Sequence, residues 1–481
     1  MKLYVMEDRR YTQYAVTSAL ALVTTTSGLA SGWFTPMMSP LVIKHRTSID
    51  VDGASIYSLD TWLWWISFLP SPGYMFGSLL TLFVCDRFGR RPTVLFSALF
   101  FLIAMIFSAA ANKAWMLCFA VFLWGIGSGI VSVVIIVYVS EIADQGIRGR
   151  LIGVTSFMGY IGSLFIVGIG SLVSYKAFNY WLPLMPVLYF AACYSIPESP
   201  YYLIRKDKIE EARDALMRLR GDCSDVGQEL ERMISHVKKE MQHSTSIFEL
   251  FRRIIYVKAI VIVFGFKLLQ QISGTVSYYH FYSRILGEST FSISMENLII
   301  IVLGVQAVAG ILAAILVDSL GRRRLLICSF IGASISIAIT AAYFFIRDTI
   351  PVSQILKSIA DGPLFSILLF VFFAEVGLNS IEVVLKAEMF PINVRITAIV
   401  ASNLFGSISI PINQLYYIAE YAIGIAGCMG VYALVALIGV IFTYFMLPET
   451  NGKSLSEIQD LLQGKKNKNQ EITNIDGIIE I

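Results

Sequence analysis

Charged residues are scarce in this sequence. Only 15% of its 481 residues are Asp, Glu, Lys or Arg, and the formal net charge is +3. Because soluble globular domains carry about 25% charged residues, this composition excludes an ordinary soluble protein. The basic residues form no concentrated surface of the kind that nucleic-acid binding requires, so no nucleic-acid partner is expected.

Cysteine is also scarce, and its spacing is not that of a metal site. The six cysteines lie mostly inside apolar runs and are Cys85, Cys118, Cys193, Cys223, Cys328 and Cys428. We predict buried apolar thiols, no disulfide framework, no metal and no other cofactor. The polar stretches contain no nucleophile–base set or phosphate loop, so no enzyme is expected. No cleavable signal peptide is expected, because Met1–Arg10 is polar and a run long enough to span a membrane follows it.

Long apolar runs are abundant, and 56% of the residues are hydrophobic. A helix that crosses a bilayer needs roughly 20 predominantly apolar residues, and about twelve such segments are present. They run unbroken and do not alternate with polar faces as in a soluble core. We therefore predict an all-α membrane protein with twelve transmembrane helices in two six-helix halves. The predicted spans are residues 11–36, 57–85, 93–111, 115–139, 151–174, 180–196, 256–286, 294–317, 325–346, 363–390, 394–419 and 422–447.

A charged motif between two apolar runs occurs once in each half of the chain. It reads Asp86-Arg87-Phe88-Gly89-Arg90-Arg91 first and Asp318-Ser319-Leu320-Gly321-Arg322-Arg323-Arg324 later. Glycine suits a tight turn, and the carboxylate can pair with the nearby arginines. The repeat predicts two equivalent halves. The predicted units are an N-terminal six-helix half (1–196), a cytosolic helical linker (197–253), a C-terminal six-helix half (254–447) and a cytosolic tail (448–481).

Lysine and arginine concentrate in alternate loops, which predicts the orientation of the chain. The repeated motifs share one side with Arg148, Arg150, the central stretch and both termini, whereas most loops on the other side are poorer in basic residues. Both termini are therefore predicted to be cytoplasmic. Two six-helix halves joined by a cytosolic stretch are typical of transporters whose substrate site lies between the halves near mid-membrane.

Six stretches, in order along nearly the whole chain, resemble signatures of the sugar porter family within the major facilitator superfamily. They are the first charged motif, Tyr138–Ile142 with Arg148–Arg150, Pro197–Leu203, Gln270–Gly274, Glu388–Pro391 with Arg395, and Pro448–Leu455. Within the family the chain is most similar to insect facilitated trehalose transporters, through Ser31-Gly32-Trp33 and Ser39-Pro40. The resemblance implies a multi-pass protein of the plasma membrane that binds a small sugar; protein partners are not implied.

Polar side chains near mid-membrane are the candidate sugar contacts. Gln270 and Gln271 lie about fourteen residues into their span, near its middle at 1.5 Å per residue. A primary amide both donates and accepts hydrogen bonds, which suits a polyhydroxylated substrate, and it would be costly in hydrocarbon without a partner. The alternative is hydrogen bonding between helices. The resemblance adds Asn403, which matches an asparagine of the family. Ser156 is a further candidate and stands where the family has a glutamine, and Tyr278 or Tyr279 would stack on a sugar ring.

Charged residues cluster at the predicted cytosolic ends of the helices. We predict ion pairs that hold this side shut and separate when the halves rock; alternatively they only fix topology and anchor loops. The predicted gate residues are Asp86, Arg87, Arg90, Arg91, Glu141, Arg148 and Glu198 in the first half, and Asp318, Arg322, Arg323, Glu388, Arg395 and Glu449 in the second.

The predicted tenth span also contains two acids, Glu375 and Glu382, seven residues apart and therefore on nearly one helix face. Ionisable residues inside a membrane are functional candidates. Lys267, on the face of Gln270, is the expected partner of one of them. We predict a Lys267–glutamate pair that lines or braces the cavity, or a static buried pair.

Several positions depart from the family pattern. Val121 stands where the family has an arginine, Val276 where it has an asparagine, and Leu378–Glu382 replaces a proline-rich break. Phe34 stands where proton-coupled relatives have an acid, which favours uniport. The leading prediction is a facilitative transporter of trehalose or a hexose such as glucose, working by alternating access. The alternatives are a proton-coupled symporter that uses Glu375 or Glu382, a porter for another small polar solute whose selectivity Glu382 reshapes, and a non-transporting sugar receptor.

Overall fold

A computed structural model of the chain describes residues 2–33, 62, 64–144, 146–170, 172–173, 175–220, 226–241, 254–275, 281–291, 293–349, 359–391, 393–453 and 455–462. Within these ranges every regular element is a helix. Nine of the described helices are long and apolar enough to span a membrane. The predicted all-α membrane fold is thus confirmed. The other three predicted spans coincide with α1, α10 and Arg395–Ile408, which fall short of the same criteria, so the number twelve stays a prediction.

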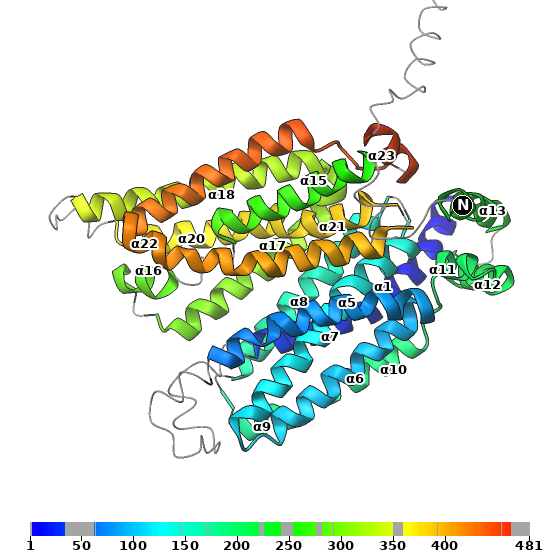
Figure 1. The fold of residues 1–481 in the computed structure, drawn as a ribbon, viewed down its shortest axis with the longest axis horizontal. Coiled ribbons are helices and arrows are strands. Elements are labelled where there is room, and N and C mark those ends of the chain that lie inside the picture. Colours follow the sequence, from blue (N-terminus) through cyan, green and yellow to red (C-terminus); the bar gives the residue numbers. More distant parts are fainter. Residues whose placement is uncertain are drawn as a thin grey trace, which may run out of the picture.

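The helices of the first half form one bundle, drawn blue to green in Figure 1. They are α1 (Lys2–Gly32), α5 (Pro70–Phe88), α6 (Arg90–Ala109), α7 (Ala114–Ile142), α8 (Arg148–Gly170), α9 (Tyr175–Tyr180) and α10 (Leu184–Tyr194). α7 lies inside the bundle and is buried along most of its length, whereas α1 packs on α8. The α1–α8 contact is so close that a Cβ atom on Gly28 would lie 1.9 Å from the carbonyl oxygen of Gly159. Glycine at this crossing therefore sets the distance between the two helices.

Three short helices follow at one end of the molecule: α11 (Pro200–Arg205), α12 (Ile209–Arg220) and α13 (Val226–Met241). The hydroxyl of Ser199 caps α11 by accepting the N–H of Tyr202. Apolar residues at helical spacing, such as Leu216, pack against α13 in a small core of their own. The C-terminal helix α23 (Leu455–Leu462) lies at the same end, which we call the linker end (Figure 1).

The second bundle contains two interrupted helices. Its elements are α15 (Ile254–Gln270), η1 (Gln271–Thr275), α16 (Tyr282–Glu288), α17 (Met295–Leu320), α18 (Arg322–Thr349), α20 (Gly362–Phe373), η3 (Ala374–Asn379), α21 (Ser380–Glu388) and α22 (Arg395–Met446). The predicted span over 256–286 contains a π-helical turn directly after α15, in which Gly274 has φ 93°. The predicted break between 419 and 422 is displaced: α22 kinks at Gly424, with φ 71°. Glycine adopts such positive φ values without a steric penalty.

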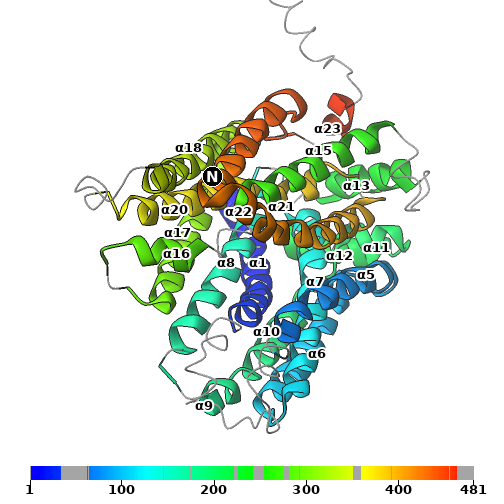
Figure 2. The ribbon, with the colours of Figure 1, turned by 60° about the vertical axis from the view of Figure 1, so that its left-hand side comes forward.

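The two bundles meet along α8 and α17 and along α5 and α22; Figure 2 shows them from a second direction. Large apolar side chains such as Phe83 and Phe365 point outward from the bundles, as expected for a surface in contact with lipid. Cys328 is exposed, so its predicted burial is wrong. An apolar helix in a membrane has a lipid-facing side, and residues on that side are not buried by protein. Cys85, Cys118, Cys193 and Cys428 are buried free thiols, and Cys223 lies outside the described residues.

Candidate functional site

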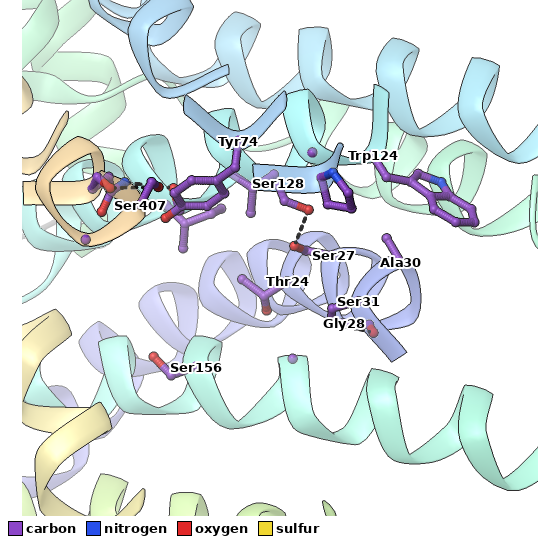
Figure 3. A pocket seen from close by; sticks show the side chains of 18 of the residues that line it. Thr24, Ser27, Gly28, Ala30, Ser31, Tyr74, Trp124, Ser128, Ser156 and Ser407 are labelled. Carbon is purple, nitrogen blue, oxygen red and sulfur yellow. Dashed lines mark hydrogen bonds between the residues drawn. The ribbon is translucent and has the colours of Figure 1, made fainter. Parts of the chain in front are cut away.

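A cavity of about 820 Å³ lies between the two bundles. The first bundle lines it with residues of α1, α5, α7 and α8, and the second adds Lys267, Gln271, Glu382, Lys386 and Asn403. Figure 3 shows Thr24 and Ser27 of α1 on one wall and Tyr74 and Trp124 on another. Its volume is typical of a site for a small organic molecule.

Hydroxyl groups dominate the polar lining of this cavity. The lining includes Thr24, Ser27, Ser31, Ser67, Ser71, Ser128, Ser132, Thr155, Ser156, Ser163 and Ser407. Ser27 Oγ donates to Ser128 Oγ at 3.0 Å, which joins α1 to α7 (Figure 3). A hydroxyl both donates and accepts, so such a wall can hydrogen-bond a ligand that is itself rich in hydroxyls.

Trp124 is a cavity residue that the sequence analysis missed. Its ring packs edge-on against Trp33 with 4.7 Å between centroids, and only 3% of the residue is exposed. Its indole N–H has no hydrogen-bond partner among the described residues. An unpaired buried donor is unfavourable by itself, and this N–H is out of reach of solvent in the structure. In the sequence Trp124 is one apolar residue within an apolar run, so nothing there singled it out.

The predicted amides divide between the cavity wall and the packing behind it. Gln271 lines the cavity, and its Nε2 donates to the carbonyl oxygen of Gly406 at 2.9 Å. Gln270 does not line it; its Nε2 donates to Asn379 Oδ1 at 2.6 Å. Asn403 lines it and donates to Ser132 Oγ of the first bundle at 3.0 Å. Gln270 therefore makes a hydrogen bond between helices, which was the alternative to a role in sugar binding.

Ser156 and Glu382 also lie at the cavity wall, where the prediction puts them. Tyr278 and Tyr279 lie outside the described residues. A side chain that lines the cavity lies within reach of a ligand, but this position alone does not show that it binds one. The substrate-binding roles of all these residues stay predictions.

Charged side chains form a cluster in the wall contributed by the second bundle. Lys267 Nζ lies 3.1 Å from Glu382 Oε2, so the predicted contact between Lys267 and a glutamate is present. Lys386 Nζ lies 2.5 Å from Glu382 Oε1 and donates to Asn403 Oδ1 at 3.1 Å. The sequence analysis missed Lys386, although its place one helical turn after Glu382 was a usable signal.

Glu375 has different partners from Glu382. It accepts from Asn379 Nδ2 at 2.8 Å and hydrogen-bonds Tyr160 of α8 in the first bundle. The prediction that both acids share one helix face assumed a regular α-helix. The π-helical turn η3 begins one residue before Glu375 and ends three residues before Glu382, and the wider turn changes the angular relation between them.

The repeated motif builds the same network twice at the linker end. In the first half Arg90 makes two parallel hydrogen bonds to Glu141, at 2.7 and 2.9 Å, and its backbone N–H donates to Glu198 at 3.0 Å. The hydroxyl of Ser199 donates to Glu141 as well. Gly89 lies between α5 and α6 with φ 109°, and a Cβ atom there would meet Glu198 at 2.4 Å.

The second half repeats these contacts residue by residue. Arg322 donates to Glu388 at 2.9 Å, and its backbone N–H donates to Glu449 at 3.0 Å. The hydroxyl of Thr450 donates to Glu388, and Gly321 has φ 86°. The two halves thus contain corresponding networks at the linker end, as expected for a repeat.

Burial changes the acidity of Glu198, which lies between α10 and α11. Removal from water raises the pKa of this carboxyl, and the backbone N–H groups of Ser199 and Arg90 partly oppose that rise.

The ion pairs of the predicted gate residues form within each half, as predicted, and their gating role stays a prediction. Hydrogen bonds between described residues connect the halves at the linker end: the backbone N–H of Arg150 donates to Asp318 Oδ2 at 2.8 Å, and Arg395 Nη1 donates to Ser140 Oγ at 3.2 Å. Asp86 instead pairs with Arg205 of α11 at 3.0 Å. Ion pairs within a half brace its helix ends and need not break when the halves separate.

The other predicted gate residues also make contacts within their own half. The guanidinium groups of Arg87, Arg91 and Arg323 lie over the rings of Phe88, Tyr194 and Tyr444, respectively. Arg148 is buried at the start of α8.

The cavity extends away from the linker end. α1 contributes to its lining from Thr24 onward, near the end of that helix, and α5 contributes from its beginning, around Pro70. Both of these parts lie far from α11–α13 (Figure 1). The halves are joined at the linker end through Asp318 and Arg395.

Comparison with known proteins identifies the relatives of the chain. A family model described as "Sugar (and other) transporter" matches residues 20–462. The facilitated trehalose transporter Tret1 of Polypedilum vanderplanki is 28% identical over 97% of this chain and 91% of its own length. The sugar transporter ERD6 of Arabidopsis thaliana is 31% identical over 81% of this chain and 79% of its own length.

A solved structure supports the same fold. The proton:xylose symporter XylE, bound to 6-bromo-6-deoxy-D-glucose, aligns with a TM-score of 0.75 at 20% identity, over 94% of this chain and all of that one. At this identity the likeness concerns the fold alone.

Proposed function

The chain belongs to the family of sugar (and other) transporters, and from this premise we propose that it moves a neutral sugar, trehalose or a hexose such as glucose, across the membrane without chemical change. The observation that carries the proposal is the cavity between the halves, lined by hydroxyl groups and the amides of Gln271 and Asn403. These groups complement a polyhydroxylated ligand with donors and acceptors.

Alternating access follows from the contacts between the halves. Asp318 and Arg395 hold the linker end closed, while the cavity extends toward the other end. We propose that sugar enters there, that the halves then rock, and that these two hydrogen bonds break to open the linker end. The bond between Asn403 and Ser132 lies at the cavity itself, so a sugar beside it would act directly on a contact between the halves.

The orientation and the boundaries of the units are part of the proposal. We place both termini and the linker 197–253 on the cytoplasmic side of the plasma membrane, because the basic loops lie at the linker end. The six-helix halves are then residues 1–196 and 254–447, and the tail is 448–481. In this orientation the cavity of the present structure extends toward the outside.

A second candidate, proton-coupled symport, is favoured by Glu375. Its carboxylate is 1% exposed and bonds to Asn379 and to Tyr160 of the other half, and the described structure offers it no cationic side chain within ion-pair distance. A buried carboxylate without a cation is a plausible proton carrier in a transporter. The two candidates differ in whether a proton gradient drives uptake.

Uptake of labelled trehalose and glucose into liposomes that contain the purified chain, at two external pH values, tests the proposal. Saturable uptake that does not depend on pH and falls several-fold in Gln271→Ala would support sugar uniport through this cavity. A matched control is Gln306→Ala, which removes a buried amide of α17 that does not line the cavity. Uptake driven by acid outside, and lost in Glu375→Gln, would favour symport. Folded protein that takes up neither sugar would refute neutral sugar transport.

A further inference from the structure

We propose that the cavity accepts a sugar that carries a carboxylate, and that the ammonium groups of Lys267 and Lys386 bind this carboxylate. The inference rests on the proposed sugar transport and names a substrate class for the same cavity. It comes from a charge imbalance in the cavity wall and from unused donors at the same place.

The charge of the lining is unbalanced. Three charged side chains line the cavity, the two lysines and Glu382, so the wall carries one positive charge in excess. Lys386 and Glu382 are each only 6% exposed. A buried charge is unfavourable unless an opposite charge accompanies it, and here one negative charge is shared between two positive ones. An anionic ligand would restore the balance.

The hydrogen bonds of the lysines leave donors for such a ligand. An ammonium group has three donors. Lys267 uses two, to Gln270 Oε1 and Glu382 Oε2, both at 3.1 Å. Lys386 donates to Asn403 Oδ1 at 3.1 Å, and its Nζ lies at ion-pair distance, 2.5 Å, from Glu382 Oε1. One N–H of each lysine therefore has no partner among the residues that the structure describes.

Glu382 keeps the two ammonium groups close together, because one of its oxygens contacts each of them. A second carboxylate, from the ligand, could accept one charge-assisted hydrogen bond from each lysine, in the same bridging arrangement. The carboxylate of Glu375 does not occupy the place proposed for the carboxylate of the ligand. It does not line the cavity, and it reaches Lys267 only through Asn379 and Gln270.

The rest of the wall favours a sugar acid over a simple inorganic anion. The hydroxyl-rich surface of α1, α5, α7 and α8 lies in the same cavity as the lysines, so a ligand of sugar size reaches both. Asn403 contacts Lys386 on one side and Ser132 of the other half on the other. The proposed carboxylate would thus bind beside a contact that joins the halves.

Competition for labelled glucose uptake in liposomes, with two ligands of nearly the same shape, tests the inference. Glucuronate carries the carboxylate, and glucuronamide replaces it with a neutral amide. We expect glucuronate to inhibit at concentrations at least about tenfold lower, because charge-assisted hydrogen bonds are roughly twice as strong as neutral ones. An inside-positive potential should also accelerate uptake of labelled glucuronate and leave glucuronamide unaffected, because only the first carries charge across the membrane.

The variant Lys386→Met should reduce the preference for glucuronate over glucuronamide toward one. Glu382 keeps Lys267 as its partner in this variant, so no buried carboxylate loses its last cation. The matched control is Lys258→Met, which removes a lysine of α15 whose ammonium donates to the carbonyl oxygen of Leu462, outside the cavity. It should keep the preference of the wild type. If Lys386→Met does not fold, the preference and the potential dependence of the wild-type protein decide.

The outcomes separate this inference from the proposed function. Saturable glucose uptake that both ligands inhibit equally, or that neither inhibits, would overturn the inference and leave neutral sugar transport standing. Uptake of glucuronate without uptake of glucose would support the inference and refute neutral sugar transport. If no labelled sugar enters, thermal stabilisation of the purified protein by glucuronate but not by glucuronamide would still support it, and equal stabilisation or none would overturn it.

Discussion

Replacing Asp318 with alanine should weaken closure at the linker end. One carboxylate oxygen of Asp318 accepts the N–H of Arg150 across the interface between the halves at 2.8 Å, and the other lies 3.0 Å from Arg322 within its own half. Arg322 keeps Glu388 at 2.9 Å after the substitution, so the second half retains its buried ion pair. The substitution removes the contact between the halves together with the pair of Asp318 and Arg322 inside the second half, and only the first of these differs between the closed and open states.

The size of the effect follows from the type of bond. A hydrogen bond to a charged group contributes about 1.5 to 3 kcal/mol. The closed state would lose roughly this amount, and the open state, in which the halves have separated, would lose none of it. Since about 1.4 kcal/mol corresponds to a factor of ten, the equilibrium should shift toward the open state by about ten- to a hundredfold. An open population of about 1% would rise to about 9% at the lower limit.

Labelling of a cavity residue measures this shift. Ser156→Cys would place a thiol in the cavity, in a background in which Cys223 and Cys328 are serine. A membrane-impermeant maleimide applied at the linker end reaches it only when that end opens. We expect labelling in Asp318→Ala to be about ten times faster or more.

The matched control is Asp86→Ala, the equivalent position of the first half, which pairs with Arg205 of α11. No contact of Asp86 with the second half is recorded within the described ranges, so its loss should leave the rate near that of the wild type. Equal rates in the two variants, or no acceleration in Asp318→Ala, would refute the assignment of the gate to Asp318.

Two further predictions concern stability. Glu141→Gln removes the carboxylate that neutralises buried Arg90 and should lower the free energy of unfolding by about 3 kcal/mol or more, seen as a lower thermal midpoint in detergent. Glu388→Gln should have a smaller effect, because Arg322 keeps Asp318 at 3.0 Å; equal losses would contradict the argument. Hydrogen bonds from Thr290 and Ser289 lower the pKa of Asp361. The ionised carboxylate of Asp361 therefore stabilises the fold at pH values above its unfolded-state pKa of about 3.9. This stabilisation is lost as the pH falls through the folded-state pKa. The difference in thermal midpoint between the wild type and Asp361→Asn should therefore be largest near neutral pH and shrink below about pH 4; a constant difference would count against it.

Much of the fold could be predicted because its signals are local. The length of an apolar run decides whether a helix can cross a membrane, and run length is visible in sequence. The charged motif around Arg90 and its repeat around Arg322 were visible for the same reason, and the structure shows that they build equivalent networks. The irregularity at Gly274 was not predicted, and the break at Gly424 was predicted a few residues too early, because a glycine in an apolar run has many possible roles.

The sequence by itself determined the class of this protein, its division into two related halves and the identity of most polar residues at its centre. Only the tertiary structure decided which of these residues face the cavity. Gln271 lines it whereas its neighbour Gln270 packs behind it, and a π-helical turn gives Glu375 and Glu382 different partners. It also showed that Asp318 reaches the other half and Asp86 does not, and that Lys386 and Trp124 belong to the cavity wall. The physical reason is that local composition sets where helices form, whereas the rotation and contact of each helix depend on packing against segments far away in the chain.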